Sequence, residues 1–235
     1  MIDIRPFSSL GTFRNEWLNA HYHFSFSRYY DPKRMGLGRL LVWNDDEIAP
    51  HTGFGAHPHD NMEIVTFVRQ GAVTHRDSLG NEGVTRAGDV QVMHAGTGIR
   101  HEELNQEDEP TRLFQIWILP DKQGVQPGWG MREFPRASGQ GLQVLASGRA
   151  VDANAGALPL YADAAVLAAK LAAGETARYV LAPGRIAYLV APMGEITVNG
   201  HDAGARDGVA VADEAEIVIT ARSAAEIVLV DAGAA

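Results

Sequence analysis

Short apolar segments rich in Val, Ile and Leu recur along the whole chain. They occupy residues 40–43, 63–68, 90–93, 113–119, 186–190, 216–220 and 227–230, with Gly, Pro, Asn or Asp between them. Runs of this length and composition are typical of strands in a β-sandwich or barrel. Turn residues gather in segments 77–83 and 194–200, as hairpins between sequential antiparallel strands require. The pattern therefore predicts an all-β fold.

The second half of the chain repeats the pattern of the first. When residues 171–194 are shifted back by 123 positions, they fall on residues 48–71 without a gap. The alanine-rich segment 162–173 has helix propensity, but under this alignment it falls on the strand that ends near residue 47, so we predict a strand there. Gly, Ser, Ala and Pro accumulate between residues 127 and 157. We expect two barrels, formed by residues 1–135 and 136–235.

Two segments of the first half carry the residues with the most distinctive chemistry. One contains His57 and His59, and the other contains His101 and Glu103. Residues i and i+2 of a strand project from the same face, so each pair directs its side chains toward one side. Two neighbouring strands would then supply four ligands to one metal ion. Imidazole and carboxylate ligands suit iron(II), nickel, manganese, copper or zinc.

The second half lacks such a constellation, because the alignment places Val180 and Ala182 opposite His57 and His59. We therefore expect a second barrel without a metal site. The remaining histidines are expected to lie outside the site; they are His21, His23, His51, His75, His94 and His201.

Composition excludes several classes of function. The formal charge of −9 and the absence of basic runs argue against nucleic-acid binding, which needs clustered Lys and Arg. The chain has no cysteine, so His and carboxylates are its only strong metal ligands. The first residues lack the basic start and apolar stretch of a secretory signal, and no apolar run is long enough to span a membrane. We expect a cytoplasmic monomer.

The two segments resemble the metal-binding motifs of the pirin family of cupins. His57-Pro58-His59 with Glu63 and Gly71 is similar to the first cupin motif, and residues 96–103 (GTGIRHEE) are similar to the second motif in its pirin form. The resemblance extends over most of residues 20–120 and is looser in the second half. It implies two cupin barrels, of which the N-terminal one binds iron or another divalent metal.

The resemblance also implies an activity. Several bacterial pirins are quercetin 2,3-dioxygenases, which open a flavonol ring with molecular oxygen. We therefore expect an oxidoreductase that takes a flavonol-like substrate and O2, with Fe(II) as its metal. A carboxylate, Glu103 or Glu63, would take the proton of the substrate hydroxyl.

The resemblance leaves one ambiguity about the fourth ligand. General cupins use the glutamate at the position of Glu63 as a ligand, whereas pirins use the one at the position of Glu103. We assign Glu103 as the ligand and expect Glu63 to orient a ligating imidazole through a hydrogen bond.

Two alternatives to flavonol cleavage stay open on the sequence. The chain could be a metal-containing regulatory module that binds a partner protein without turnover, since other pirins are binding partners of regulatory or metabolic proteins. It could also act on another enol or enediol, because a cupin fold does not fix the reaction.

Overall fold

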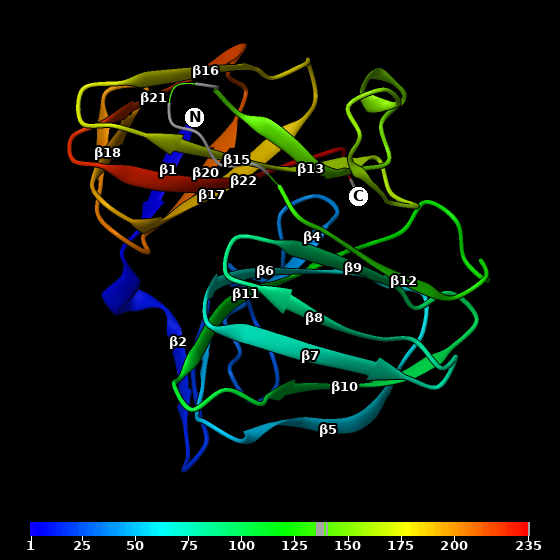
Figure 1. Ribbon diagram of the computed structural model, residues 1–235. Helices are drawn as coiled ribbons and strands as arrows, with labels where there is room; N and C mark the ends of the chain where they lie inside the picture. The colour runs from blue at the N-terminus through cyan, green and yellow to red at the C-terminus, as the bar shows by residue number, and fades with distance from the viewer. Residues whose placement is uncertain (135–138, 140, 235) are drawn as a thin grey trace.

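The computed structural model describes residues 1–134, 139 and 141–234, which form two stacked β-barrels (Figure 1). The first barrel contains β2 (Gly11–Arg14), β3 (Leu18–Tyr22), β4 (Leu40–Ile48), β5 (Thr52–His59), β6 (Glu63–Gln70), β7 (Ala72–Asp77), β8 (Glu82–Arg86), β9 (Val90–His94), β10 (Ile99–Asn105), β11 (Thr111–Ile118) and β12 (Gly128–Arg132). The second contains β1 (Ile2–Arg5), β13 (Gln143–Ser147), β14 (Leu158–Pro159), β15 (Ala164–Leu171), β16 (Thr176–Val180), β17 (Ile186–Met193), β18 (Ile196–Val198), β19 (His201–Ala203), β20 (Gly208–Ala212), β21 (Glu216–Ala221) and β22 (Ala225–Ala232). Two 3-10 turns, η1 (Phe7–Ser9) and η2 (Ala150–Asp152), complete the regular structure of the described residues.

Each barrel consists of a seven-stranded and a four-stranded sheet. In the first barrel the orders are β12-β9-β6-β11-β4-β3-β2 and β5-β10-β7-β8, and in the second they are β1-β20-β17-β22-β15-β13-β14 and β16-β21-β18-β19. All pairs are antiparallel except β13 with β14. The predicted apolar segments lie in strands, except that segment 113–119 extends one residue past the end of β11, so the all-β prediction is confirmed.

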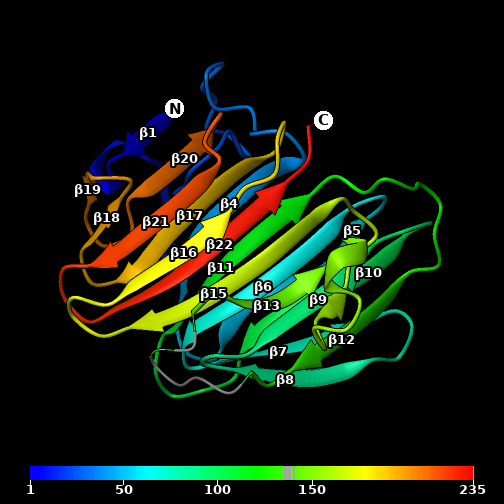
Figure 2. The ribbon, with the colours of Figure 1, turned by 90° about the horizontal axis from the view of Figure 1, so that it is seen from above.

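The two seven-stranded sheets pack face to face. Figure 2 shows β17, β22 and β15 of one sheet and β11 and β6 of the other running along much the same diagonal. One hydrophobic cluster joins them, with Phe67 and Phe114 from the first barrel and Val166, Tyr188 and Val228 from the second. These strands are therefore covered by apolar groups on two sides. This explains why their sequences are continuous apolar runs instead of alternating patterns.

The internal repeat predicted from the sequence is present in the structure. With the shift of 123 positions, β17 falls on β6 from end to end, and the last residue of β15 falls on the last residue of β4. The alanine-rich segment is a strand, as predicted. Its side chains alternate between the core of the second barrel, which contains Ala165 and Leu167, and the cluster between the barrels, which contains Ala164 and Val166. Small side chains suit a strand buried on both faces.

The first strand of the chain belongs to the second barrel. β1 pairs antiparallel with β20, with Ile2 opposite Val211 and Arg5 opposite Gly208. The chain then passes through η1 into β2 of the first barrel. The sequence predicted that residues 1–135 form the first barrel, so β1 was expected there, whereas it pairs in the second barrel. The expected boundary between residues 135 and 136 lies outside the described residues.

A buried ion cluster also connects the barrels. Asp45, on β4, has a fully buried side chain and binds two guanidinium groups. One belongs to Arg69 of the first barrel, and the other to Arg206, which precedes β20, with a distance of 2.6 Å from Arg206 Nε to Asp45 Oδ2. Arg69 also lies over the ring of Phe114, 4.6 Å from its centroid. The cluster therefore depends on the relative position of the two barrels.

Among the described residues, no helix has the length and apolar character needed to cross a membrane.

His23 provides a pH-dependent contribution to this interface. Its ring is completely buried, and its Nδ1 lies 2.8 Å from the hydroxyl of Tyr188 on β17. Burial, followed by the charges of Arg5 and Arg206, lowers the pKa of His23 well below its usual range. The folded protein keeps this ring neutral, whereas the unfolded chain binds a proton below about pH 6.5. The contribution of neutral His23 to the free energy of unfolding is therefore fully present above that pH and is lost as the pH falls below it.

We expect the free energy of unfolding of the wild type to decrease by about 2 kcal/mol relative to that of His23→Gln between pH 7 and pH 5. Urea unfolding at the two pH values measures this difference, and the other titrating groups cancel in the comparison. A difference that does not change with pH would contradict a neutral, buried His23.

Candidate metal centre

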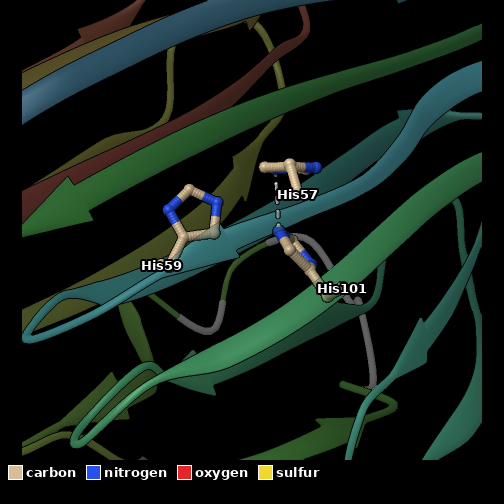
Figure 3. Close-up of side chains that lie close together, drawn as sticks. All are labelled: His57, His59 and His101. Atoms are coloured by element: carbon tan, nitrogen blue, oxygen red, sulfur yellow. Dashed lines mark hydrogen bonds between the residues drawn. The ribbon is translucent and has the colours of Figure 1, made fainter.

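Three imidazoles converge at one end of the first barrel. His57 and His59 lie on β5, and His101 lies directly opposite His57 on the antiparallel neighbour β10. One ring nitrogen of each lies within 4.8 Å of the others, and the Nε2 atoms of His57 and His101 are 3.1 Å apart. Figure 3 shows the three rings gathered between the two strands. The three histidines predicted from strand geometry are thus brought together.

The arrangement is partly open to solvent. His101 is buried, with 2% of its surface exposed, whereas His57 and His59 are half-buried. The outer edge of the site is therefore accessible to a small molecule, while its inner side is enclosed by the barrel.

Burial and neighbouring charges keep two of the rings, those of His59 and His101, in the neutral form that binds metals. Burial, then the neighbouring rings of His101 and His57, lowers the pKa of His59 to about 4. Burial, then His57 and His75, lowers the pKa of His101 to about 3. A metal ligand must be a neutral imidazole, and these two rings are neutral at physiological pH. Neutral, converging imidazole nitrogens fit a divalent transition-metal ion.

Glu103 lies on β10 beside this group and is buried. Its carboxylate accepts hydrogen bonds from Gln91 Nε2 at 2.7 Å, Gln115 Nε2 at 2.6 Å and Thr66 Oγ1 at 3.0 Å. The register of β10 against β5 shifts between residues 101 and 103, so Glu103 pairs with Phe54. Burial lowers the pKa of His59, and the negative charge of Glu103 has a smaller, opposite effect that raises it. The carboxylate is therefore fixed close to the imidazoles, and its assignment as fourth ligand stays a prediction.

Glu63 has a different environment from the one expected for it. Val65 and Phe67, which project from the same face of β6 as Glu63, pack in the cluster between the barrels. Thr66, on the opposite face, contacts Glu103 inside the first barrel. The carboxylate of Glu63 lies 2.6 Å from His94 Nδ1 and accepts the backbone N–H of Tyr161 at 3.1 Å. Its described hydrogen bonds therefore link the two barrels and do not reach the three imidazoles.

His75 reaches the site although the sequence did not indicate it. It lies on β7, the other neighbour of β10, and its Nδ1 is 3.5 Å from His101 Nδ1. The same spacing that singled out His57 and His59 also relates His75 to Asp77, two residues further along the same strand. This signal was present in the sequence, but the sequence showed no partner strand for it, and the pairing of β7 with β10 supplies that partner.

The other histidines lie elsewhere, as expected. His51 is exposed and contacts Asp108, His94 contacts Glu63, and His23 contacts Tyr188. In the second barrel, β16 occupies the place of β5, and Val180 and Ala182 have no ligand atoms in their side chains. The absence of a metal from that barrel stays a prediction.

Aromatic side chains surround the imidazoles. Trp117 meets His59 edge-on with ring centroids 5.0 Å apart, and Phe26 packs edge-on against Trp117 at 5.4 Å. Phe54 lies 6.4 Å from His57. Phe26, Phe54 and Trp117 are half-buried. These exposed aromatic surfaces suit a flat apolar ligand next to the nitrogen atoms.

Comparison with known proteins agrees with the fold and the motifs. The Pirin family model matches residues 4–118, and the model of the quercetinase C-terminal cupin domain matches residues 145–232. A pirin-like protein of Caulobacter vibrioides is 57% identical over 233 residues, which cover 99% of this chain and 100% of that protein. A quercetin 2,3-dioxygenase of Escherichia coli K12 is 40% identical over 232 residues, which cover 98% of each chain.

A solved structure shows the same architecture. The crystal structure of the bacterial pirin YhhW from Escherichia coli in complex with nickel(II) superimposes with a TM-score of 0.93, at 39% identity, over 100% of both chains. The prediction of two cupin barrels is thus confirmed. Because the Pirin model matches the first barrel and close relatives match nearly the whole length, the chain belongs to the pirin family.

Proposed function

We propose that this protein is a metal-dependent dioxygenase that opens the ring of a flavonol such as quercetin with molecular oxygen. The observation that carries the proposal is the convergence of three imidazoles, those of His57, His59 and His101, beside the buried carboxylate of Glu103. The name of the Escherichia coli relative, which is 40% identical over 98% of the chain, supports this reaction class.

The residues that would hold the metal are the three histidines and Glu103. A divalent ion bound there would stabilise the deprotonated hydroxyl of an enol substrate and lower the pKa of that hydroxyl. We propose Fe(II) as the metal; nickel is the ion in the complex of the Escherichia coli pirin. Nitrogen and oxygen ligands accept either ion, so the donor set alone does not select one.

Glu103 is the residue we propose to receive the substrate's proton. A carboxylate offers about four acceptor positions, and Gln91, Gln115 and Thr66 use three of them. The remaining position is available for the metal or for the hydroxyl proton. The three donors hold the carboxylate in one orientation, so the group does not have to reorganise during the reaction.

The aromatic side chains have a positioning role in this proposal. Trp117 lies beside His59 and Phe54 lies beside His57, and both would present apolar surface to a planar ligand. They would orient the flavonol rings and exclude water while the substrate is oxidised and O2 is reduced, with the two oxygen atoms entering the ring-opened product.

The proposal is tested by reconstitution. The metal-free protein is loaded separately with Fe(II), Ni(II), Mn(II) or Cu(II), and quercetin absorbance and oxygen uptake are followed together. We expect metal-dependent loss of quercetin with matching oxygen uptake in the wild type and in His51→Ala, which alters an exposed histidine far from the site. His57→Ala is expected to lose the activity.

A different outcome would redirect the proposal. Tight metal binding without oxygen uptake on quercetin in any loaded form would exclude flavonol dioxygenation. It would favour the alternative that the protein is a metal-containing regulatory module.

A further inference from the structure

A continuous chain of buried polar groups extends from the imidazole of His101 away from the metal centre. His101 Nδ1 lies 3.5 Å from His75 Nδ1, and His75 Nε2 lies 3.1 Å from Asp77 Oδ2. The side chains of His75 and Asp77 have no exposed surface, and His101 is 2% exposed. The series Asp77–His75–His101 therefore leads from a carboxylate to a nitrogen that faces His57.

The positions of the hydrogen atoms in this series follow from donor and acceptor accounting. His101 Nε2 faces His57 Nε2 at 3.1 Å, so it must present its lone pair there when a metal is bound. A neutral imidazole carries one N–H, so the proton of His101 then lies on Nδ1 and points at His75 Nδ1. His75 Nδ1 accepts it, and His75 Nε2–H donates to Asp77. One tautomer of each ring satisfies every contact.

The surrounding structure holds this series rigidly. Asp77 Oδ1 accepts the backbone N–H groups of Leu79 at 2.9 Å and Asn81 at 3.1 Å, and Asn81 Nδ2 donates to Oδ2 at 2.9 Å. These bonds belong to the turn between β7 and β8, so the carboxylate is fixed without the help of His75.

Trp129, on β12, fixes the plane of the His75 ring. The two rings are stacked, with centroids 4.7 Å apart and planes 7° apart. Gly83 makes room for the indole, since a Cβ on this residue would lie 2.3 Å from Trp129. Residues of β8, β10 and β12 thus surround the ring of His75, although His75 is not one of the three proposed histidine ligands.

We propose that His75 and Asp77 are positioning residues of the metal centre, which hold His101 in the tautomer and orientation that present Nε2 to the ion. The proposal rests on His101 being a metal ligand, as in the proposed function, but it does not depend on the substrate. Hydrogen bonding of the second ring nitrogen to an acceptor fixes a ligating imidazole and increases its donor strength. His57 shows the same device in a simpler form, because its Nδ1 lies 2.8 Å from the carbonyl oxygen of Gly55.

The experiment compares four variants of the full-length protein by Ni(II) affinity, measured in competition with a chromophoric chelator. His75→Phe keeps an aromatic ring against Trp129 but removes the acceptor, and Asp77→Asn places an amide N–H against His75 Nε2. His75→Gln restores an acceptor for His101. Asn81→Ala weakens the turn that holds Asp77 but leaves the polar series intact.

We expect His75→Phe and Asp77→Asn to bind Ni(II) about 10- to 100-fold more weakly than the wild type. His75→Gln and Asn81→Ala should bind close to the wild type. In the zinc-loaded wild type, imidazole nitrogen NMR should show the proton of His75 on Nε2. Thermal unfolding of the metal-free variants checks that each is folded.

Two results would overturn the proposal. One is wild-type Ni(II) affinity in His75→Phe, and the other is an equal loss in all four variants, which would indicate a packing effect. Failure of the wild type to bind Ni(II) is a different result, because it would remove the proposed metal function itself.

Discussion

Replacing Glu103 with Gln is expected to reduce ring-opening turnover by about 10³-fold while the barrel remains folded. The variant keeps the size of the side chain but removes its charge, and with it both the proposed fourth ligand and the proposed proton acceptor. Metal affinity should fall as well. The variant is measured by oxygen uptake and by metal content after loading.

The hydrogen bonds of Glu103 predict a moderate cost in stability for this variant. Gln115 Oε1 accepts the indole N–H of Trp117 at 2.9 Å, so the amide of Gln115 cannot turn over and must direct its N–H at residue 103. In Glu103→Gln, the new amide N–H₂ must face either Gln115 Nε2 or Gln91 Nε2, which are both donors. In either orientation one buried donor loses its acceptor. We expect a loss of about 1–3 kcal/mol in the free energy of unfolding.

Glu102 provides the matched control for this prediction. It precedes Glu103 on β10, but its side chain points away from the barrel and binds Arg76 at 3.3 Å. Glu102→Gln should keep wild-type turnover and metal content. Wild-type turnover in Glu103→Gln would contradict its assignment as ligand and proton acceptor.

Asp45→Asn is expected to destabilise the protein by about 3–5 kcal/mol, because it leaves two guanidinium groups at a buried site without their shared anion. Asp45 is fully buried between Arg69, which is 9% exposed at its side chain, and Arg206, which is 30% exposed. Urea unfolding of the metal-free protein measures the loss. Since Arg206 belongs to the second barrel, the midpoint should shift for both barrels together.

The control lies on the same strand. Glu47 is two residues from Asp45 and pairs with Arg112 at 2.6 Å, but its side chain is 34% exposed and that of Arg112 is 46% exposed. An exposed pair contributes at most about 1 kcal/mol, so Glu47→Gln should have a small effect. Equal destabilisation by the two variants would show that burial does not determine the strength of the Asp45 cluster.

Strand geometry predicted from the sequence that the imidazoles of the candidate metal centre converge. His57 and His59 alternate with Pro58 on β5, and this local rule places two imidazoles on one face whatever the rest of the fold does. The repeat predicted the alanine-rich strand correctly because the pattern of turns outweighed the helix propensity of alanine. Both the pair of imidazoles on β5 and the alanine-rich strand depend on the order of residues along the chain, which the sequence shows directly.

Features that depend on the relative position of strands were harder to predict. The chain reverses between β5 and β6, so the parity of His59 does not carry over to Glu63, whose carboxylate contacts His94 and Tyr161 at the interface of the barrels. His75 reaches His101 because β7 pairs with β10, a neighbour that is distant in sequence. Neither relation can be read from spacing alone.

The crossing of β1 into the second barrel imposes an order of events during synthesis. β1 is synthesised before the strands of the first barrel, but its partner β20 begins at Gly208. At translation rates of about 5–20 residues per second, the first strand waits for roughly 10–40 seconds before β20 is made. During that time the first barrel can close, while β1 has no partner strand yet. A fragment that starts after the first barrel would lack this strand and would leave β20 as an open edge, to which a second molecule could add.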